Sequence, residues 1–73
     1  MEPREKKILE LALESDGLTV PIVCDKLDTN YPTALGILTD LLAKGYFRLV
    51  KVTSGYRTFI PVKEKIREAL QER

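Results

Sequence analysis

The sequence contains no histidine, no tryptophan and a single cysteine, Cys24. One cysteine excludes an internal disulfide, and without histidine or a second thiol the usual ligand set of a zinc site cannot be assembled. The absence of histidine also removes the commonest general acid or base, and neither a carboxylate pair nor a glycine-rich phosphate loop takes its place. We therefore expect no enzymatic activity, no metal and no cofactor, and no small-molecule ligand is evident.

Cys24 itself lies in a helical pattern beside the apolar residues Ile22, Val23 and Leu27. A reactive thiol needs exposure and a positively charged neighbourhood. The pattern therefore favours Cys24 as a small buried hydrophobic residue over a redox sensor.

Neither sign of charge is in excess, because 12 basic and 11 acidic residues give a net charge near +1. A dedicated nucleic-acid-binding protein is usually more basic, so this balance argues weakly against such a role. Long apolar runs are also missing, and the charged start MEPREKK is not a signal peptide. We expect a soluble, cytoplasmic protein with no membrane partner. The abundance of Glu, Lys and Arg beside one Asn and one Gln is typical of thermophile proteins.

The residues that are present suffice for one small domain covering residues 1–73. An apolar fraction of 44% is ordinary for a globular chain, although this length is near the lower limit for a single core. Apolar spacing and turn residues predict helices over about 3–15, 21–28 and 31–44, a hairpin over 46–62 and a helix over 63–72.

Proline and glycine set the expected ends of the first two helices. Pro3 can open the first helix, since the missing N–H of proline costs nothing in a first turn. Gly17 suits the left-handed position that follows a helix end. Val20 should be extended, because Pro21 follows it and starts the second helix.

The third helix has clear signals at both ends. Asn30 or Thr29 can cap its start, and Gly45 can close it. The helical spacing predicts a core-facing side formed by Ala34, Leu38, Leu41 and Leu42.

Two strand-like runs, 47–53 and 56–62, follow this helix and join at Ser54-Gly55. Both are rich in β-branched and aromatic residues. Their apolar residues do not alternate cleanly, so the pattern does not define the buried face. Pro61 belongs near a strand end.

Three motifs carry a resemblance to a known family. They are Leu18-Thr19 before the second helix, Asn30-Tyr31-Pro32-Thr33-Ala34 at the start of the third, and Leu41-Leu42-Ala43-Lys44-Gly45-Tyr46 at its end. With the hairpin, residues 18–62 resemble the winged helix-turn-helix domain of small bacterial and archaeal transcription regulators. The resemblance implies an α+β, mainly α fold, with a three-helix core, a two- or three-stranded antiparallel wing and a C-terminal helix.

The same resemblance implies binding of double-stranded DNA, with the third helix in the major groove and the basic wing on the backbone. The groove accepts one helix, whose polar side chains reach base edges while basic side chains contact phosphates. The site residues that follow are Asn30, Tyr31, Thr33, Gly36, Thr39, Lys44, Arg48, Lys51, Ser54, Tyr56 and Arg57.

The middle of the third helix departs from the family pattern. It has no basic residue before Lys44, and Asp40 places a negative charge on the expected outer side. Gly36 costs about 0.5–1 kcal/mol of helix stability relative to alanine. It could permit close approach of DNA or of another protein, or relieve crowding inside the domain. The alternative function is therefore a protein-interaction module that docks a partner on Leu35-Gly36-Ile37.

The C-terminal helix raises a separate question of assembly. Ile66, Ala69 and Leu70 form one apolar stripe. This stripe could pack on the first helix of the same chain, or it could form a homodimer through the first and last helices.

Overall fold

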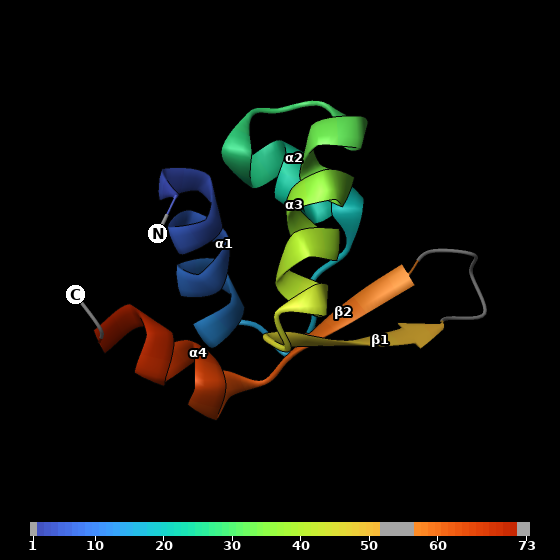
Figure 1. Ribbon diagram of the computed structural model, residues 1–73. Coiled ribbons are helices and arrows are strands. Elements are labelled where there is room, and N and C mark those ends of the chain that lie inside the picture. Colours follow the sequence, from blue (N-terminus) through green and yellow to red (C-terminus); the bar gives the residue numbers. More distant parts are fainter. Residues whose placement is uncertain (1, 52–56, 72–73) are drawn as a thin grey trace.

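Four helices and one antiparallel hairpin form the part of the chain that the computed structural model describes, residues 2–51 and 57–71 (Figure 1). In chain order these are α1 (Pro3–Leu13), α2 (Val20–Leu27), α3 (Tyr31–Ala43), β1 (Phe47–Lys51), β2 (Arg57–Pro61) and α4 (Lys63–Gln71). This arrangement confirms the predicted α+β, mainly helical fold. Figure 1 shows α4 packed beside α1 and the hairpin extending away from the helices. Within the two described ranges, no helix has the length and apolar character needed to cross a membrane.

Helix α1 begins at Pro3, as predicted, but ends earlier than predicted, at Leu13. The Glu2 side chain caps it by accepting a hydrogen bond from the Arg4 N–H at 3.2 Å. After the helix, the Ser15 hydroxyl accepts from the Gly17 N–H at 3.2 Å and donates to the Gly17 carbonyl at 2.7 Å. These local side-chain bonds compete with the helical ladder and end α1.

Gly17 has a different role from the one predicted. Its φ is not positive, and it lies beyond the helix cap. A Cβ atom on Gly17 would meet Thr58 Cγ2 at 2.9 Å and Ile60 Cδ1 at 3.2 Å. The glycine therefore allows the chain after α1 to pass close to β2. Leu18 and Phe59 exchange two backbone hydrogen bonds there, of 2.9 and 2.7 Å, so the third strand allowed by the prediction is an isolated bridge.

Helix α2 begins at Val20, and the prediction that this residue is extended was wrong. The Thr19 hydroxyl caps the helix by accepting from the Ile22 N–H at 3.4 Å. Pro21 then falls in the first turn, where its missing N–H leaves no helical bond unmade. The cap thus outweighs the preference against helix before proline.

Helix α3 has the two end signals that the sequence predicts. Asn30 Oδ1 caps its start by accepting from the Thr33 N–H at 2.9 Å. At the other end Gly45 has a φ of 88°. The N–H groups of Gly45 and the next residue donate to the carbonyls of Leu42 and Leu41, both at 3.0 Å. This pair of bonds is a Schellman motif, and it turns the chain into β1.

The hairpin register decides which face of the wing is buried. The paired residues are Phe47–Pro61, Arg48–Ile60, Leu49–Phe59, Val50–Thr58 and Lys51–Arg57. Phe47 and Phe59 lie on the same face and meet edge to face, with ring centroids 6.2 Å apart. At the end near the helices β1 begins at Phe47, as predicted, whereas β2 ends at Pro61, one residue earlier than predicted. Residues 52, 53 and 56, at the other end, lie outside the described residues.

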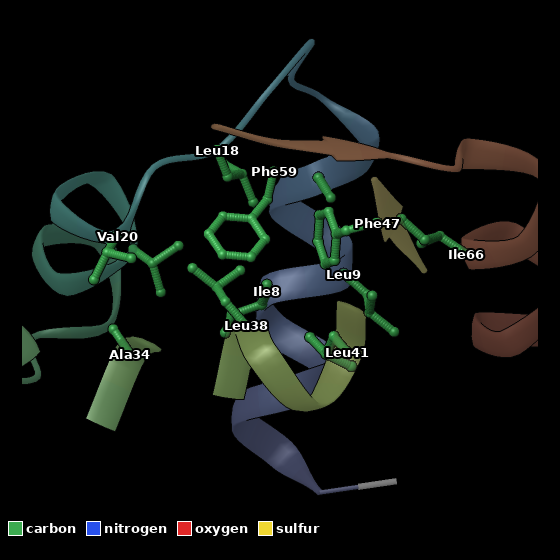
Figure 2. Close-up of a cluster of buried hydrophobic side chains, with 12 residues drawn as sticks. Ile8, Leu9, Leu18, Val20, Ala34, Leu38, Leu41, Phe47, Phe59 and Ile66 are labelled. Atoms are coloured by element: carbon green, nitrogen blue, oxygen red, sulfur yellow. The ribbon is translucent and has the colours of Figure 1, made fainter. Parts of the chain in front are cut away.

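One cluster of buried apolar side chains joins every helix to both strands (Figure 2). Its members, each at most 3% exposed, are Ile8, Leu9, Ala12, Leu18, Val20, Val23, Ala34, Leu38, Leu41, Phe47, Phe59 and Ile66. Figure 2 shows the two phenylalanine rings beside Ile8, Leu9 and Leu38. Leu42 and Cys24 were predicted to be buried but are only half-buried at the edge of this cluster.

The apolar stripe of α4 packs within the chain. Ile66 is fully buried, Leu70 lies against the core cluster, and α4 is in contact with α1. The intramolecular packing that the sequence allowed is therefore present. A homodimer through α1 and α4 stays a prediction.

Candidate nucleic-acid interface

Helix α3 turns one side to the core and the other to the surroundings. Ala34, Leu38 and Leu41 are buried on the inner side. The predicted site residues of the helix lie elsewhere: Asn30, Tyr31, Gly36 and Thr39 are exposed, and Thr33 is half-buried. Tyr31 stands out as a large side chain that is 51% exposed. The accessible side of the helix therefore carries mostly uncharged groups.

Two polar side chains on this face already bond to the helix backbone. Asn30 Oδ1 is held by the cap to Thr33, which leaves the amide N–H groups of Asn30 to donate elsewhere. The Thr39 hydroxyl donates to the Leu35 carbonyl at 2.7 Å, so it can only accept a further bond. These two residues thus offer an outside partner a donor and an acceptor, respectively.

Gly36 is exposed in the middle of the same face. A Cβ atom placed on it would meet nothing within 4 Å. The hypothesis that Gly36 relieves crowding inside the domain is therefore wrong. Its neighbours Leu35 and Ile37 are half-buried against the core, so Leu35-Gly36-Ile37 is not the open apolar surface that the alternative function proposed.

Lys44 lies at the C-terminal end of α3 and is bound to other helices. Its ammonium forms an ion pair with Glu5 of α1 at 3.2 Å. Its carbonyl accepts a hydrogen bond of 2.7 Å from Lys65 Nζ of α4, and that ammonium also lies 5.4 Å from the ring centroid of Tyr46. The sequence did not predict this cluster, because its residues are far apart in the chain and share no local pattern.

The wing carries the clearest concentration of positive charge. Residues 46–62 contain three basic residues and no acidic one. Arg48 and Arg57 are exposed. The register places Arg57 opposite Lys51 at the far end of the ladder, and strand alternation puts Arg48 on the other face. The remaining predicted wing residues, Ser54 and Tyr56, lie outside the described residues.

Two apolar side chains of the wing are also accessible. Leu49 is 43% exposed and Val50 is 47% exposed, on opposite faces of β1. Their exposure could not be predicted from the sequence, because the strand pattern left the buried face undefined. Among residues 2–51 and 57–71, no group of three or more potential metal ligands comes together.

The arrangement of helices and wing has close counterparts among solved structures. One is MepR, a transcription regulator of the Staphylococcus aureus multidrug efflux pump MepA. It superimposes with a TM-score of 0.82 at 19% identity, over 96% of this chain and 55% of the other. The transcriptional regulator Tm0710 from Thermotoga maritima superimposes with a TM-score of 0.77 at 23% identity, over 99% of this chain and 53% of the other. A MarR family protein from Bacillus stearothermophilus superimposes with a TM-score of 0.72 at 20% identity, over 97% of this chain and 54% of the other.

The chain has the winged helix-turn-helix fold. Helices α2 and α3 form the helix-turn-helix, and β1 with β2 forms the wing. The winged-helix chain spans little more than half the length of each of these three proteins. No protein-family model and no curated protein matches its sequence.

Proposed function

We propose that this winged helix binds double-stranded DNA and serves as the DNA-binding part of a transcription regulator. Helix α3 would enter the major groove, and the wing would contact the sugar-phosphate backbone. The observation that carries the proposal is the wing with its three basic residues and no acidic one, beside an accessible α3 face. That its structural counterparts are transcription regulators supports the same function.

Each region has a distinct part in the proposed complex. Arg48, Lys51 and Arg57 would neutralise phosphates and supply most of the affinity, because contacts of this kind release counterions. Ser54 and Tyr56, which come between the two strands in the sequence, would add contacts to backbone or minor groove.

On α3, Asn30, Tyr31, Thr33 and Thr39 would contact base edges or nearby phosphates through uncharged groups. Gly36 would let the helix backbone approach the groove. Lys44 is bound to Glu5 and is therefore assigned only a minor contact.

We further propose that the protein acts as a dimer, since two-fold operators are read by two copies of such a domain. The stripe that includes Ile66 is already buried against the chain's own core. A dimer through α1 and α4 would have to use the remaining surfaces of these helices.

The second candidate is a protein-interaction module that does not bind DNA. It is favoured by the exposed apolar residues Leu49 and Val50 on the wing, which a purely phosphate-binding surface does not need. Sedimentation and pull-down measurements distinguish the candidates: a strict monomer without a protein partner that binds DNA tightly excludes the module.

Fluorescence anisotropy with a labelled mixed-sequence duplex tests DNA binding directly. Titrations at about 50 and 200 mM salt should show an affinity that falls steeply as salt rises. Arg57→Ala and Lys51→Ala should each weaken binding, because each removes a proposed phosphate contact. Arg67→Ala removes the same charge from the exposed surface of α4 and is the matched control, with sedimentation to verify that its oligomeric state is unchanged.

The control should bind about as tightly as the unmodified chain. Absence of binding at the lower salt concentration would exclude the proposed function. So would unchanged affinity in both wing variants.

A further inference from the structure

Asp40 is an acidic residue on the side of α3 that the proposed function turns toward DNA. It is the only acidic residue between Tyr31 and Ala43, and it is exposed. Within residues 2–51 and 57–71 its carboxylate takes part in no ion pair or side-chain hydrogen bond. Facing phosphate, such a group would only be repelled. Within the proposed complex, this carboxylate can bind DNA favourably only where its partner donates a hydrogen bond.

Gly36 lies one helical turn before Asp40 and on the same side of the helix. Because a Cβ atom there would meet nothing within 4 Å, the domain itself gains nothing from the glycine. Without a side chain at Gly36, the helix surface next to the Asp40 carboxylate consists of backbone atoms alone. A base pair can therefore come closer to α3 at this point than at a position occupied by a larger residue.

The chemistry of the major groove selects the partner. Guanine and thymine present only acceptors or a methyl group there, and a carboxylate cannot bond to these. Adenine has a donor amino group, but its N7 acceptor lies beside it and would repel the second carboxylate oxygen. Cytosine presents the N4 amino group between its own C5–H and the O6 acceptor of the paired guanine, so a carboxylate that approaches from the C5 side meets no acceptor of the cytosine itself.

We propose, on the basis of the proposed function, that Asp40 is a specificity-determining residue that accepts a hydrogen bond from the N4 amino group of a cytosine, with Gly36 allowing the approach. The contact adds discrimination rather than affinity, since the carboxylate also repels neighbouring phosphates. Replacing the carboxylate by an amide reverses the preference, because asparagine pairs with adenine through N6 and N7.

The experiment is a binding selection from a pool of duplexes with a randomised segment, followed by competition with the selected duplex. The unmodified chain should enrich cytosine at one position of its site, and replacing that cytosine by thymine should weaken binding about tenfold. Asp40→Asn should enrich adenine at that position. Asp40→Ala should lose the preference without gaining another.

Asp25→Asn makes the same carboxylate-to-amide change on the exposed surface of α2, outside the proposed dimer surfaces, and should leave the base preference unchanged. If both Asp40 variants keep the base preference of the unmodified chain and only bind every duplex more tightly, Asp40 merely repels phosphate and the inference is wrong. If the unmodified chain binds DNA without enriching cytosine, the inference also fails while the proposed function stands. If it binds no duplex, both fail.

Discussion

Helix α3 and the wing lie side by side in the chain but differ in charge and in exposure. From Tyr31 to Ala43 the helix has no basic residue and one acidic residue, whereas residues 46–62 have three basic residues and no acidic one. The accessible face of α3 carries hydroxyl and amide groups and a glycine. The wing carries exposed guanidinium groups together with exposed apolar side chains. In the proposed complex, contacts to bases and electrostatic attraction to phosphates would therefore come from different regions.

The two regions nevertheless depend on one shared core. Phe47 and Phe59 anchor the wing among residues of α1 and α3 (Figure 2). The wing is therefore positioned relative to α3 by buried aromatic contacts and not by its own charges.

The largest effect should come from Phe59→Ala, which removes this anchor. Phe59 is 2% exposed, so truncation should lower the free energy of unfolding by about 3–5 kcal/mol. Leu49, opposite Phe59 in the hairpin, is the matched control because it is 43% exposed. Leu49→Ala should cost about 1 kcal/mol or less. Urea denaturation followed by circular dichroism measures the free energy of unfolding of both variants. Equal decreases in this free energy would show that the wing is not anchored through Phe59.

A smaller effect, of opposite sign, is expected at Gly36. Alanine meets no atom there and is the better helix former, so Gly36→Ala should raise the free energy of unfolding by about 1 kcal/mol. The same variant should bind DNA more weakly, because a methyl group then stands on the face of α3 that is proposed to enter the major groove. Thermal melting measures the change in stability, and fluorescence anisotropy measures the change in DNA affinity.

Gly17→Ala is the control for this prediction. Its new Cβ would lie 2.9 Å from the Thr58 methyl, so stability should fall by about 1 kcal/mol or more. If the Gly36→Ala variant is stabilised but its DNA affinity is unchanged, Gly36 does not lie in the proposed interface.

The smallest effect should come from Lys44→Ala. Its pair with Glu5 is partly exposed, and pairs of this kind contribute about 0–1 kcal/mol. Because the ammonium is held toward α1, DNA affinity should change less than in Arg57→Ala. Anisotropy titrations at one salt concentration compare the two variants. A larger loss for Lys44→Ala would move the main phosphate contact from the wing to the end of α3.

Local signals in the sequence predicted much of this fold. Asn30 and Gly45 mark the ends of α3, and helical spacing identified Ala34, Leu38 and Leu41 as its buried residues. Such features depend on neighbours within one or two turns, which a single sequence displays. The errors at Val20 and Ser15 are also local, because threonine and serine side chains bonded to the backbone and shifted the helix ends.

Contacts between distant segments could not be predicted. The role of Gly17 depends on Thr58 in β2, and the pair of Lys44 with Glu5 joins two helices. The pattern of β1 did not show that Leu49 and Val50 would be exposed. For the candidate site, residue types indicated which groups could contact DNA, but only the packing showed that Gly36 is open and that Lys44 is already paired.

In the proposed complex the wing supplies the electrostatic attraction to DNA and α3 does not. The most direct test measures the slope of log affinity against log salt concentration for two double variants. In Arg48→Gln/Arg57→Gln the slope should become shallower by about 2, because each phosphate contact contributes about 1. In Tyr31→Ala/Thr39→Ala affinity should fall while the slope stays unchanged. A slope that is unchanged in the wing variant, or shallower only in the α3 variant, would show that the wing does not supply the electrostatic attraction.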